Sequence, residues 1–383
     1  MQSAMNAECL ERVINVGFIG LGGFVRGNHL PNVAKNPHFK IVGMCDLNED
    51  ILHSVGREYD PCFSTMDFKE LCSDSSIDLV IIGTGPSFRI APIREACENG
   101  KSIYVEKPMS LGWEDSREII EIVRKNNSRL MVGFNRPYSK IMRETKRIFK
   151  KIQNDGPALF NYRIVSEDML WPQFHRDLLA GSESTIVHEL THIFDLFNWL
   201  LEKDPKRLYT IGGKSDNNII TIEYPGQNYV SIVSGGCGTE GYPKERLEIF
   251  TGNKVVVMDE FLELQATQVP SERGITLFAR KGCNGSKPEF VSSSKHLEDL
   301  QNWRKELTPQ QIAKGYYYDS RPLVDKGHYD AIEFMYNLIV NDQPAETNEY
   351  RGAVATIMGL EAIKSLSLDR PVDLDFSGLQ LPN

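Results

Sequence analysis

The sequence contains no run of about 18 or more apolar residues, which argues against a membrane-spanning helix. Residues 1–12 lack the apolar core of a signal peptide. The seven cysteines are odd in number and scattered, without a CxxC pair, which disfavours a disulfide framework and a zinc ribbon. We therefore expect a cytoplasmic protein with reduced thiols and no membrane partner.

An excess of basic residues is also missing, because the formal net charge is -9. No basic stretch is interleaved with aromatic residues, so the sequence disfavours a nucleic-acid partner. The one basic cluster, at 140–151, carries an apolar helical stripe, which predicts a helix with a solvated basic face. A length of 383 residues with 41% hydrophobic content predicts two domains with sizeable cores.

The first third of the chain alternates strand-like and helix-like patterns. We expect strands at 13–19, 39–45, 78–83, 102–105 and 130–134, and helices between them such as 90–99 and 113–126. This alternation predicts an α/β N-terminal Rossmann domain, a doubly wound parallel sheet, over residues 1–136.

After Pro137 the pattern changes to apolar residues at every second position. Such runs occur at 160–164, 219–224, 229–233, 246–250 and 254–258. They predict a C-terminal α+β domain over 137–325, with an open and mainly antiparallel sheet. Two helical patterns, at 328–341 and 350–367, lie in a third segment, 326–383, which we expect to pack back on the first domain.

A glycine turn follows the first expected strand. Gly20-Leu21-Gly22-Gly23 is typical of the strand, turn and helix start that bind a dinucleotide pyrophosphate. The usual third small residue is replaced by Val25, which predicts a looser approach of helix to strand.

An acid, Asp46, ends the second expected strand, at about the separation of the carboxylate that binds the adenosine ribose. A carboxylate there repels a 2′-phosphate, so it favours NAD over NADP. The alternative is that Asp46 only caps the next helix.

The tripeptide Glu106-Lys107-Pro108 places a cation directly after the strand expected at 102–105. The carboxyl ends of parallel strands form the edge where ligands bind in open α/β sheets. Together with the glycine turn, this cation indicates an enzyme.

These motifs carry a resemblance that spans nearly the whole chain. The chain resembles the glucose-fructose oxidoreductase / inositol dehydrogenase family, often written Gfo/Idh/MocA. The resemblance rests on the glycine turn followed by His29, then Cys45-Asp46, Thr84, Glu106-Lys107-Pro108, 133–136 and 192–195. The resemblance implies an NAD(P)-dependent oxidoreductase that acts on a secondary alcohol or ketone of a sugar, sugar derivative or cyclitol. It also implies a homodimer or homotetramer formed through the open sheet.

The predicted site residues fall into three groups, and the resemblance supplies the roles of Lys107 and His192. The catalytic group is Lys107, which hydrogen-bonds the reacting hydroxyl, His192, the general acid/base, and Asp195, which either orients His192 or is structural. The cofactor group is Gly20, Gly22, Gly23, Phe24, Asp46, Thr84, Glu106 and Lys107. The substrate group is Lys107, Arg136, Arg163, Trp171, His175, His188, Glu189 and His192.

The chain departs from the family pattern upstream of His192. Many members carry an acid four residues before the histidine, where this chain has His188 followed by Glu189. On one helix, His188, His192 and Asp195 would share a polar face directed at a cleft. Arg89 stands where similar proteins often have histidine, which hints at an anionic or phosphorylated substrate; the alternative is a surface ion pair.

Two other classes of function compete with the dehydrogenase. Residues 188–192 spell HExxH, the arrangement in which two histidines hold zinc and a glutamate activates water. A zinc hydrolase would leave the glycine turn, Asp46 and the Glu-Lys-Pro element unexplained, so we expect no metal. The third class is a dinucleotide-binding sensor without turnover.

Overall fold

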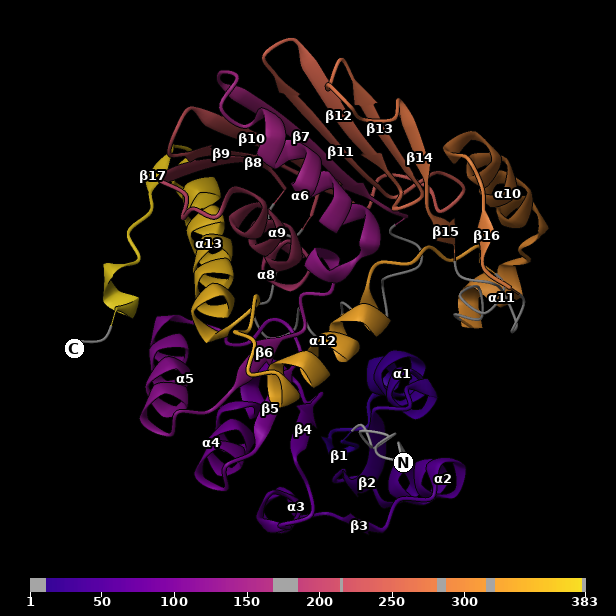
Figure 1. Ribbon diagram of the computed structural model, residues 1–383, viewed down its shortest axis with the longest axis vertical. Coiled ribbons are helices and arrows are strands. Elements are labelled where there is room, and N and C mark those ends of the chain that lie inside the picture. Colours follow the sequence, from indigo (N-terminus) through magenta and orange to yellow (C-terminus); the bar gives the residue numbers. More distant parts are fainter. Residues whose placement is uncertain (1–11, 168–184, 214–215, 281–286, 315–320, 381–383) are drawn as a thin grey trace, which may run out of the picture. The chain divides into compact units, whose positions relative to one another are not determined.

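The computed structural model describes residues 12–167, 185–213, 216–280, 287–314 and 321–380 (Figure 1). The chain divides into two compact units, each with its own large sheet. Unit 1 comprises Met1–Ser110, Glu118–Gly133 and Tyr329–Glu349, and unit 2 comprises Leu111–Arg117, Phe134–His328 and Tyr350–Asn383. The domain limits predicted from the sequence stay predictions.

Unit 1 contains a six-stranded parallel sheet in the order β3-β2-β1-β4-β5-β6. Its strands are β1 (Ile14–Ile19), β2 (Phe39–Cys45), β3 (Phe63–Thr65), β4 (Leu79–Ile82), β5 (Ser102–Val105) and β6 (Leu130–Val132). The connecting helices are a π-helical turn η1 (Val25–His29), α1 (Leu30–Lys35), α2 (Glu49–Tyr59), α3 (Phe68–Ser73), η2 (Pro86–Phe88), α4 (Ile90–Glu98) and α5 (Trp113–Lys125). The predicted Rossmann architecture is confirmed. The edge strand β3 was not predicted, because three partly exposed residues give no periodic signal.

Unit 2 contains a nine-stranded sheet in the order β14-β13-β12-β11-β7-β10-β9-β8-β17, in which only β10 and β7 pair in parallel. The strands are β7 (Ala158–Val165), β8 (Arg207–Gly212), β9 (Asn218–Tyr224), β10 (Asn228–Gly235), β11 (Glu245–Thr251), β12 (Lys254–Asp259), β13 (Glu263–Thr267), β14 (Ile275–Leu277) and β17 (Val372–Asp373). A two-stranded ribbon, β15 (Ala279–Arg280) and β16 (Glu289–Phe290), precedes α10 (Ser293–Glu306) and α11 (Pro309–Lys314). The expected open, mainly antiparallel sheet is confirmed.

Helices cover one face of this sheet: α6 (Lys140–Ile152), α9 (Thr191–Leu201) and α13 (Glu349–Leu368) (Figure 1). The α9 ring of Phe197 meets Phe160 and Tyr162 of β7 edge to face, at centroid distances of 5.8 and 5.9 Å. On α13, Ser365 accepts the backbone N–H of Thr210 on β8. The covered face is therefore the face on which Tyr162 and Thr210 lie.

The apolar stripe predicted on the basic helix is buried in α6, which leaves most of its basic side chains on the outside. The two C-terminal helices divide between the units. α12 (His328–Val340) belongs almost entirely to unit 1, where Glu333 bonds Asn36 and His38. α13 belongs to unit 2 from Tyr350 onward.

Candidate functional site

The glycine turn at the end of β1 requires glycine at one position and leaves open backbone at two others. Gly20 has a φ of +84°, and a Cβ on it would lie 2.9 Å from the backbone nitrogen of Thr84. A Cβ on Gly22 or Gly23 would meet nothing within 4 Å. Gly22 and Gly23 are also exposed, so the helix start after the turn is open, as the binding of a phosphate at a helix N-terminus requires.

Val25, at the position of the missing third glycine, is fully buried rather than loosely packed. The space for its side chain comes from Gly83 at the end of β4, where a Cβ would lie only 2.2 Å from Val25 Cγ2. The prediction of a looser approach is therefore wrong, because the glycine that permits close packing is on the neighbouring strand. The helix also widens into the π-helical turn η1 at Val25.

The Asp46 carboxylate lies against the glycine turn. One oxygen accepts the backbone N–H of Leu21 at 2.6 Å and the other accepts that of Asn48 at 2.9 Å. The N-cap of α2 is Asn48, whose side chain accepts the N–H of Ile51 at 3.1 Å, so the alternative in which Asp46 caps this helix is wrong. Asp46 instead links the turn after β1 to the end of β2.

The Glu106 side chain is buried behind the Glu-Lys-Pro segment and bonded to His29. Oε1 lies 2.6 Å from His29 Nε2, and Oε2 accepts the backbone N–H of Lys107 at 3.2 Å. Burial alone would raise the pKa of Glu106, but the hydrogen bond and charge of His29, with smaller contributions from Lys107 and Arg89, leave that pKa lowered. Glu106 is therefore a buried, ionised carboxylate directly behind Lys107, which is half-buried.

Arg89 is buried and its guanidinium donates to three backbone carbonyls, those of Thr84, Glu106 and Pro108. These carbonyls belong to the ends of β4 and β5, so Arg89 fixes the backbone on both sides of Lys107. The hint of an anionic substrate is wrong for this residue, because its donors are used within the protein. Sequence reasoning missed this role because the partners come together only in the fold.

Two other predicted cofactor residues lie near this site. The Thr84 hydroxyl donates to the carbonyl of Phe88 at 3.2 Å, and its own carbonyl holds Arg89. The Phe24 ring is 41% exposed and meets the ring of His29 edge to face, at 5.3 Å. Phe24 is thus positioned beside the glycine turn with an accessible ring face.

In unit 2, the segment with the two histidines is not one helix. α8 (Thr185–His188) ends at His188, and α9 begins at Thr191 after a turn with i to i+3 bonds from His192 to Glu189 and from Ile193 to Leu190. Every residue of α9 is buried. The predicted helix with one polar face is therefore wrong, because α9 is apolar on nearly all sides and is packed as a core helix.

His192 and Asp195 have different surroundings within α9. The His192 ring is 6% exposed and meets Phe134 edge to face at 5.8 Å. The Asp195 carboxylate lies 2.5 Å from the Arg351 guanidinium of α13, which also donates to the Asp195 carbonyl. Burial raises the pKa of Asp195 to about 7 against the opposing effect of Arg351. The structure gives Asp195 a different partner from the His192 that we predicted.

Arg136 and Glu189 belong to a buried charge cluster centred on Glu245. Arg136 donates to both Glu245 oxygens, at 2.8 and 2.9 Å, and lies 3.6 Å from Glu189. Tyr162 and Lys326 also donate to Glu245, at 2.6 and 2.5 Å. Glu189 in turn accepts from Lys244 at 3.0 Å. The Arg136 guanidinium is therefore committed to Glu245, while Glu189, with its side chain 19% exposed, lies at the margin of the cluster.

Arg163 is not brought to the covered face of the sheet. It neighbours Tyr162 on β7, so its side chain lies on the opposite face, where it donates to the Pro243 carbonyl at 2.9 Å and covers the Tyr242 ring at 4.7 Å. Trp171 and His175 lie outside the described residues.

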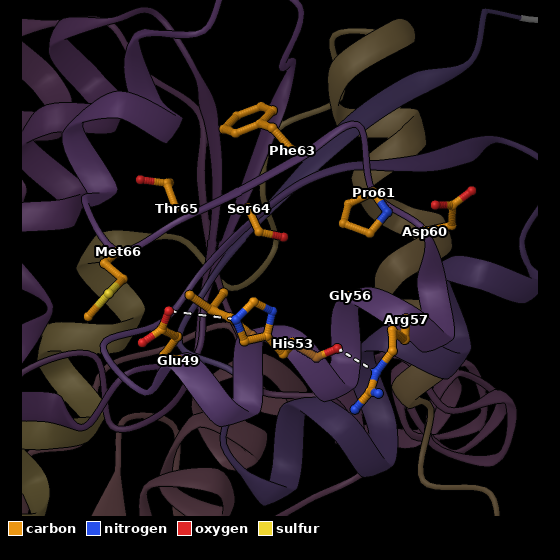
Figure 2. A pocket seen from close by; sticks show the side chains of 11 residues that line it. Glu49, His53, Gly56, Arg57, Asp60, Pro61, Phe63, Ser64, Thr65 and Met66 are labelled. Carbon is orange, nitrogen blue, oxygen red and sulfur yellow. Dashed lines mark hydrogen bonds and ion pairs between the residues drawn. The ribbon is translucent and has the colours of Figure 1, made fainter.

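Among residues 12–167, 185–213, 216–280, 287–314 and 321–380, no group of three or more His, Cys, Asp or Glu side chains could hold a metal ion. None of the helices in these ranges is long and apolar enough to span a membrane. Unit 1 has an open hollow of about 430 Å³ between α2 and β3. Figure 2 shows His53 and Arg57 of α2 on one side of it and Phe63 to Met66 on the other. None of the predicted site residues lines this hollow.

Comparison with known proteins identifies the class of oxidoreductase. Residues 14–134 match the family described as "Oxidoreductase family, NAD-binding Rossmann fold", GFO_IDH_MocA. The chain is 33% identical over 235 residues to the scyllo-inositol 2-dehydrogenase (NAD(+)) of Bacillus subtilis (strain 168), covering 60% of this chain and 67% of that protein. The chain therefore belongs to the Gfo/Idh/MocA family, and it is an oxidoreductase.

The likeness extends over nearly the whole chain in two further relatives. The myo-inositol 2-dehydrogenase of Thermotoga maritima is 20% identical over 373 residues, covering 94% of this chain and 99% of that protein. The scyllo-inositol dehydrogenase of Lactobacillus casei, solved with NAD(H) and scyllo-inositol, is similar with a TM-score of 0.69 and 18% identity, covering 94% of this chain and 99% of that one. These likenesses extend to both units of the fold.

Proposed function

We propose that the protein is an NAD-dependent dehydrogenase or reductase acting on a secondary alcohol or ketone of a sugar, sugar derivative or cyclitol. The observation that carries the proposal is the edge of unit 1, where the open glycine turn, the Asp46 carboxylate and the buried support of Lys107 lie at the carboxyl ends of β1, β2 and β5 of one parallel sheet. This arrangement fits a dinucleotide whose pyrophosphate meets Gly22 and Gly23 and whose ribose meets Asp46. Similarity to inositol dehydrogenases supports the substrate class.

The proposed chemistry uses His192 and Lys107. A bound nicotinamide would accept the hydride from the carbinol carbon of the substrate. His192 accepts the hydroxyl proton, since imidazole exchanges protons near neutral pH. Lys107 donates to the same oxygen and stabilises the alkoxide as charge develops. His188 and Glu189 contact the substrate from the turn before α9, where both are half-buried; Asp195, paired with Arg351, has no part in this proposal.

A substrate screen tests the proposed function. The purified protein is incubated with NAD and a panel of cyclitols, aldoses and sugar nucleotides, and nicotinamide absorbance is followed. Turnover of at least one sugar or cyclitol is expected. Tight NADH binding without turnover of any panel member would favour the sensor instead, and peptide hydrolysis that a chelator abolishes would favour the zinc hydrolase.

Asp46 is expected to set the preference for NADH over NADPH. A carboxylate facing a 2′-phosphate costs about one to a few kcal/mol, or roughly tenfold or more in affinity. Asp46→Ala should narrow the gap between the two dissociation constants in titration calorimetry. Asp46→Asn removes the charge but keeps an oxygen that can accept the Leu21 N–H. It therefore separates the effect of the charge on cofactor preference from the effect of the hydrogen bond that supports the turn. Asp50→Ala, in the first turn of α2, is the control, and tighter NADPH than NADH binding by the parent protein would refute the preference.

The open face of the unit 2 sheet supports a homo-oligomer as part of this proposal. Leu159, Tyr229 and Phe250 are cross-strand neighbours on β7, β10 and β11 and are 54%, 45% and 41% exposed. Such an apolar patch on a sheet face is typical of a protein contact. We propose that a second copy of the chain covers it.

Light scattering on the purified protein tests the oligomer. Leu159→Lys should convert a dimer or tetramer into smaller species, because the charge would be buried at the contact. Leu368→Lys changes a leucine at the end of α13 that is 46% exposed, and it should leave the mass unchanged. A monomeric parent protein, or a Leu159→Lys variant with the parent's mass, would exclude this interface.

A cytoplasmic location completes the proposal. The described cysteines Cys45, Cys62, Cys72, Cys97 and Cys237 are free thiols, as a reducing compartment favours.

A further inference from the structure

His29 is a buried residue to which neither the sequence motifs nor the family roles gave a task. It ends the π-helical turn η1, and its ring is fully buried between Phe24 and Tyr104, at centroid distances of 5.3 and 5.1 Å. Single π-helical turns are rare and often occur at functional sites. The turn directs the imidazole toward the end of β5.

The partner of His29 is the carboxylate that supports Lys107. Because an ionised carboxylate only accepts hydrogen bonds, His29 Nε2 donates to Glu106 Oε1 over 2.6 Å. The other Glu106 oxygen accepts the Lys107 backbone N–H. A contact therefore runs from η1 through one buried side chain to the backbone of the predicted catalytic lysine.

The position of Glu106 is fixed by close packing. A Cβ on Gly133 would lie 2.8 Å from Glu106 Oε1 and 3.1 Å from the Tyr104 hydroxyl, so glycine is needed at the end of β6. The charged groups that face the carboxylate are His29 from η1, Arg89 from the start of α4, and Lys107 beside it. The His29 side chain hydrogen-bonds the Glu106 carboxylate.

We propose that His29 is a positioning residue for the oxidoreductase reaction: it keeps Glu106 charged and in place, and Glu106 holds Lys107. This inference rests on the proposed function. Without His29, burial favours the neutral form of the carboxyl, so the pKa of Glu106 rises. At pH values between the Glu106 pKa of the parent and that of the variant, Glu106 of the variant is protonated. Lys107 then loses its negative neighbour. The acidic limb of the pH-rate profile must move to higher pH.

The test compares His29→Leu, which removes the donor, with His29→Gln, which keeps an N–H donor without imidazole. The protein is labelled with ¹³C at the glutamate side-chain carboxyl groups, and NMR follows their signals as the pH is changed. The signal of Glu106 is the one missing from the spectrum of Glu106→Gln. The apparent pKa of Glu106 should increase in the order parent, His29→Gln, His29→Leu. The kcat of His29→Leu should fall about tenfold to a hundredfold, as when an outer partner of a reactive group is removed, with a smaller change in NADH affinity.

The matched control is His38→Leu. His38 forms another imidazole-carboxylate pair in unit 1, with Glu333 at 3.0 Å, but it precedes β2 at the opposite end of the strands. His38→Leu should leave the Glu106 titration and the pH-rate profile unchanged.

If Glu106 titrates with the same pKa in the parent and in His29→Leu, the inference is overturned. If His29→Leu does not fold, the same pKa in the parent and in His29→Gln overturns it. A merely structural role for His29 would lower the melting temperature without moving either titration or profile. The NMR titration needs no substrate, so it decides the role of His29 even if turnover fails. Turnover alone decides the proposed function.

Discussion

His192→Ala is expected to lower kcat by about 10²- to 10⁴-fold, the usual contribution of a positioned general acid or base. Lys107→Ala should also lower kcat sharply, because the developing alkoxide loses its cation. NADH affinity should be nearly unchanged in both variants, since neither side chain dominates cofactor binding. His192→Ala should also flatten the acidic limb of the pH-rate profile. Stopped-flow kinetics and titration calorimetry measure these effects.

His188→Ala is the variant that can overturn this assignment. His188 ends α8, one turn before His192, and is half-buried rather than packed in the core. If His188→Ala abolishes turnover while His192→Ala retains most of it, proton transfer belongs to His188. A melting curve for each variant is needed, because His192 packs against Phe134 and its removal also leaves a cavity.

Glu245→Ala is expected to have the largest effect on stability, at about 3–5 kcal/mol, the usual cost of leaving a buried charge without its partner. Glu245 is fully buried, and its removal takes away the carboxylate that both Arg136 and Lys326 contact. Glu248→Ala is the control on the same strand. Glu248 lies on the open face with a 25% exposed side chain, so its change should cost about 1 kcal/mol or less.

Urea unfolding measures the free energy of unfolding of the parent, Glu245→Ala and Glu248→Ala. Each transition is fitted separately if the two units unfold independently. Equal losses of stability in the two variants would contradict the central role of Glu245.

Acidification gives a second check on the role of Glu245. Burial would raise the pKa of Glu245, but Arg136, Lys326 and Lys244 hold it well below the ordinary value. Its contribution is therefore present above the unfolded pKa of about 4.3 and lost as the pH falls below it, so the gap between parent and Glu245→Ala should narrow in acid.

The two kinds of sheet could be predicted because their signals are local, although β8 and β13 of the second sheet were missed. Alternating strand and helix periods defined the parallel sheet, and runs of period two defined five strands of the second sheet. Gly20, Asp46 and Lys107 could also be predicted, because each occupies a fixed place at the end of a parallel strand. The short edge strands β3, β14 and β17 were missed because two or three residues carry no period.

Partners distant in the chain could not be predicted. His29 and Glu106 are 77 residues apart and Arg136 and Glu245 are 109 apart, and nothing in either local sequence specifies the other. The role of Arg89 could not be predicted either, because its three carbonyl partners come together only in the fold.

The sequence by itself thus determined the two sheets and the family, since backbone periodicity and turn chemistry act over a few residues. The tertiary structure alone decided which charged side chains are paired inside the protein and with which partners. It placed Arg163 on the open face and Tyr162 on the covered face, and it paired Asp195 with Arg351. The physical reason is that burying a charge requires a partner, and the partner comes from whichever distant segment the fold packs against it.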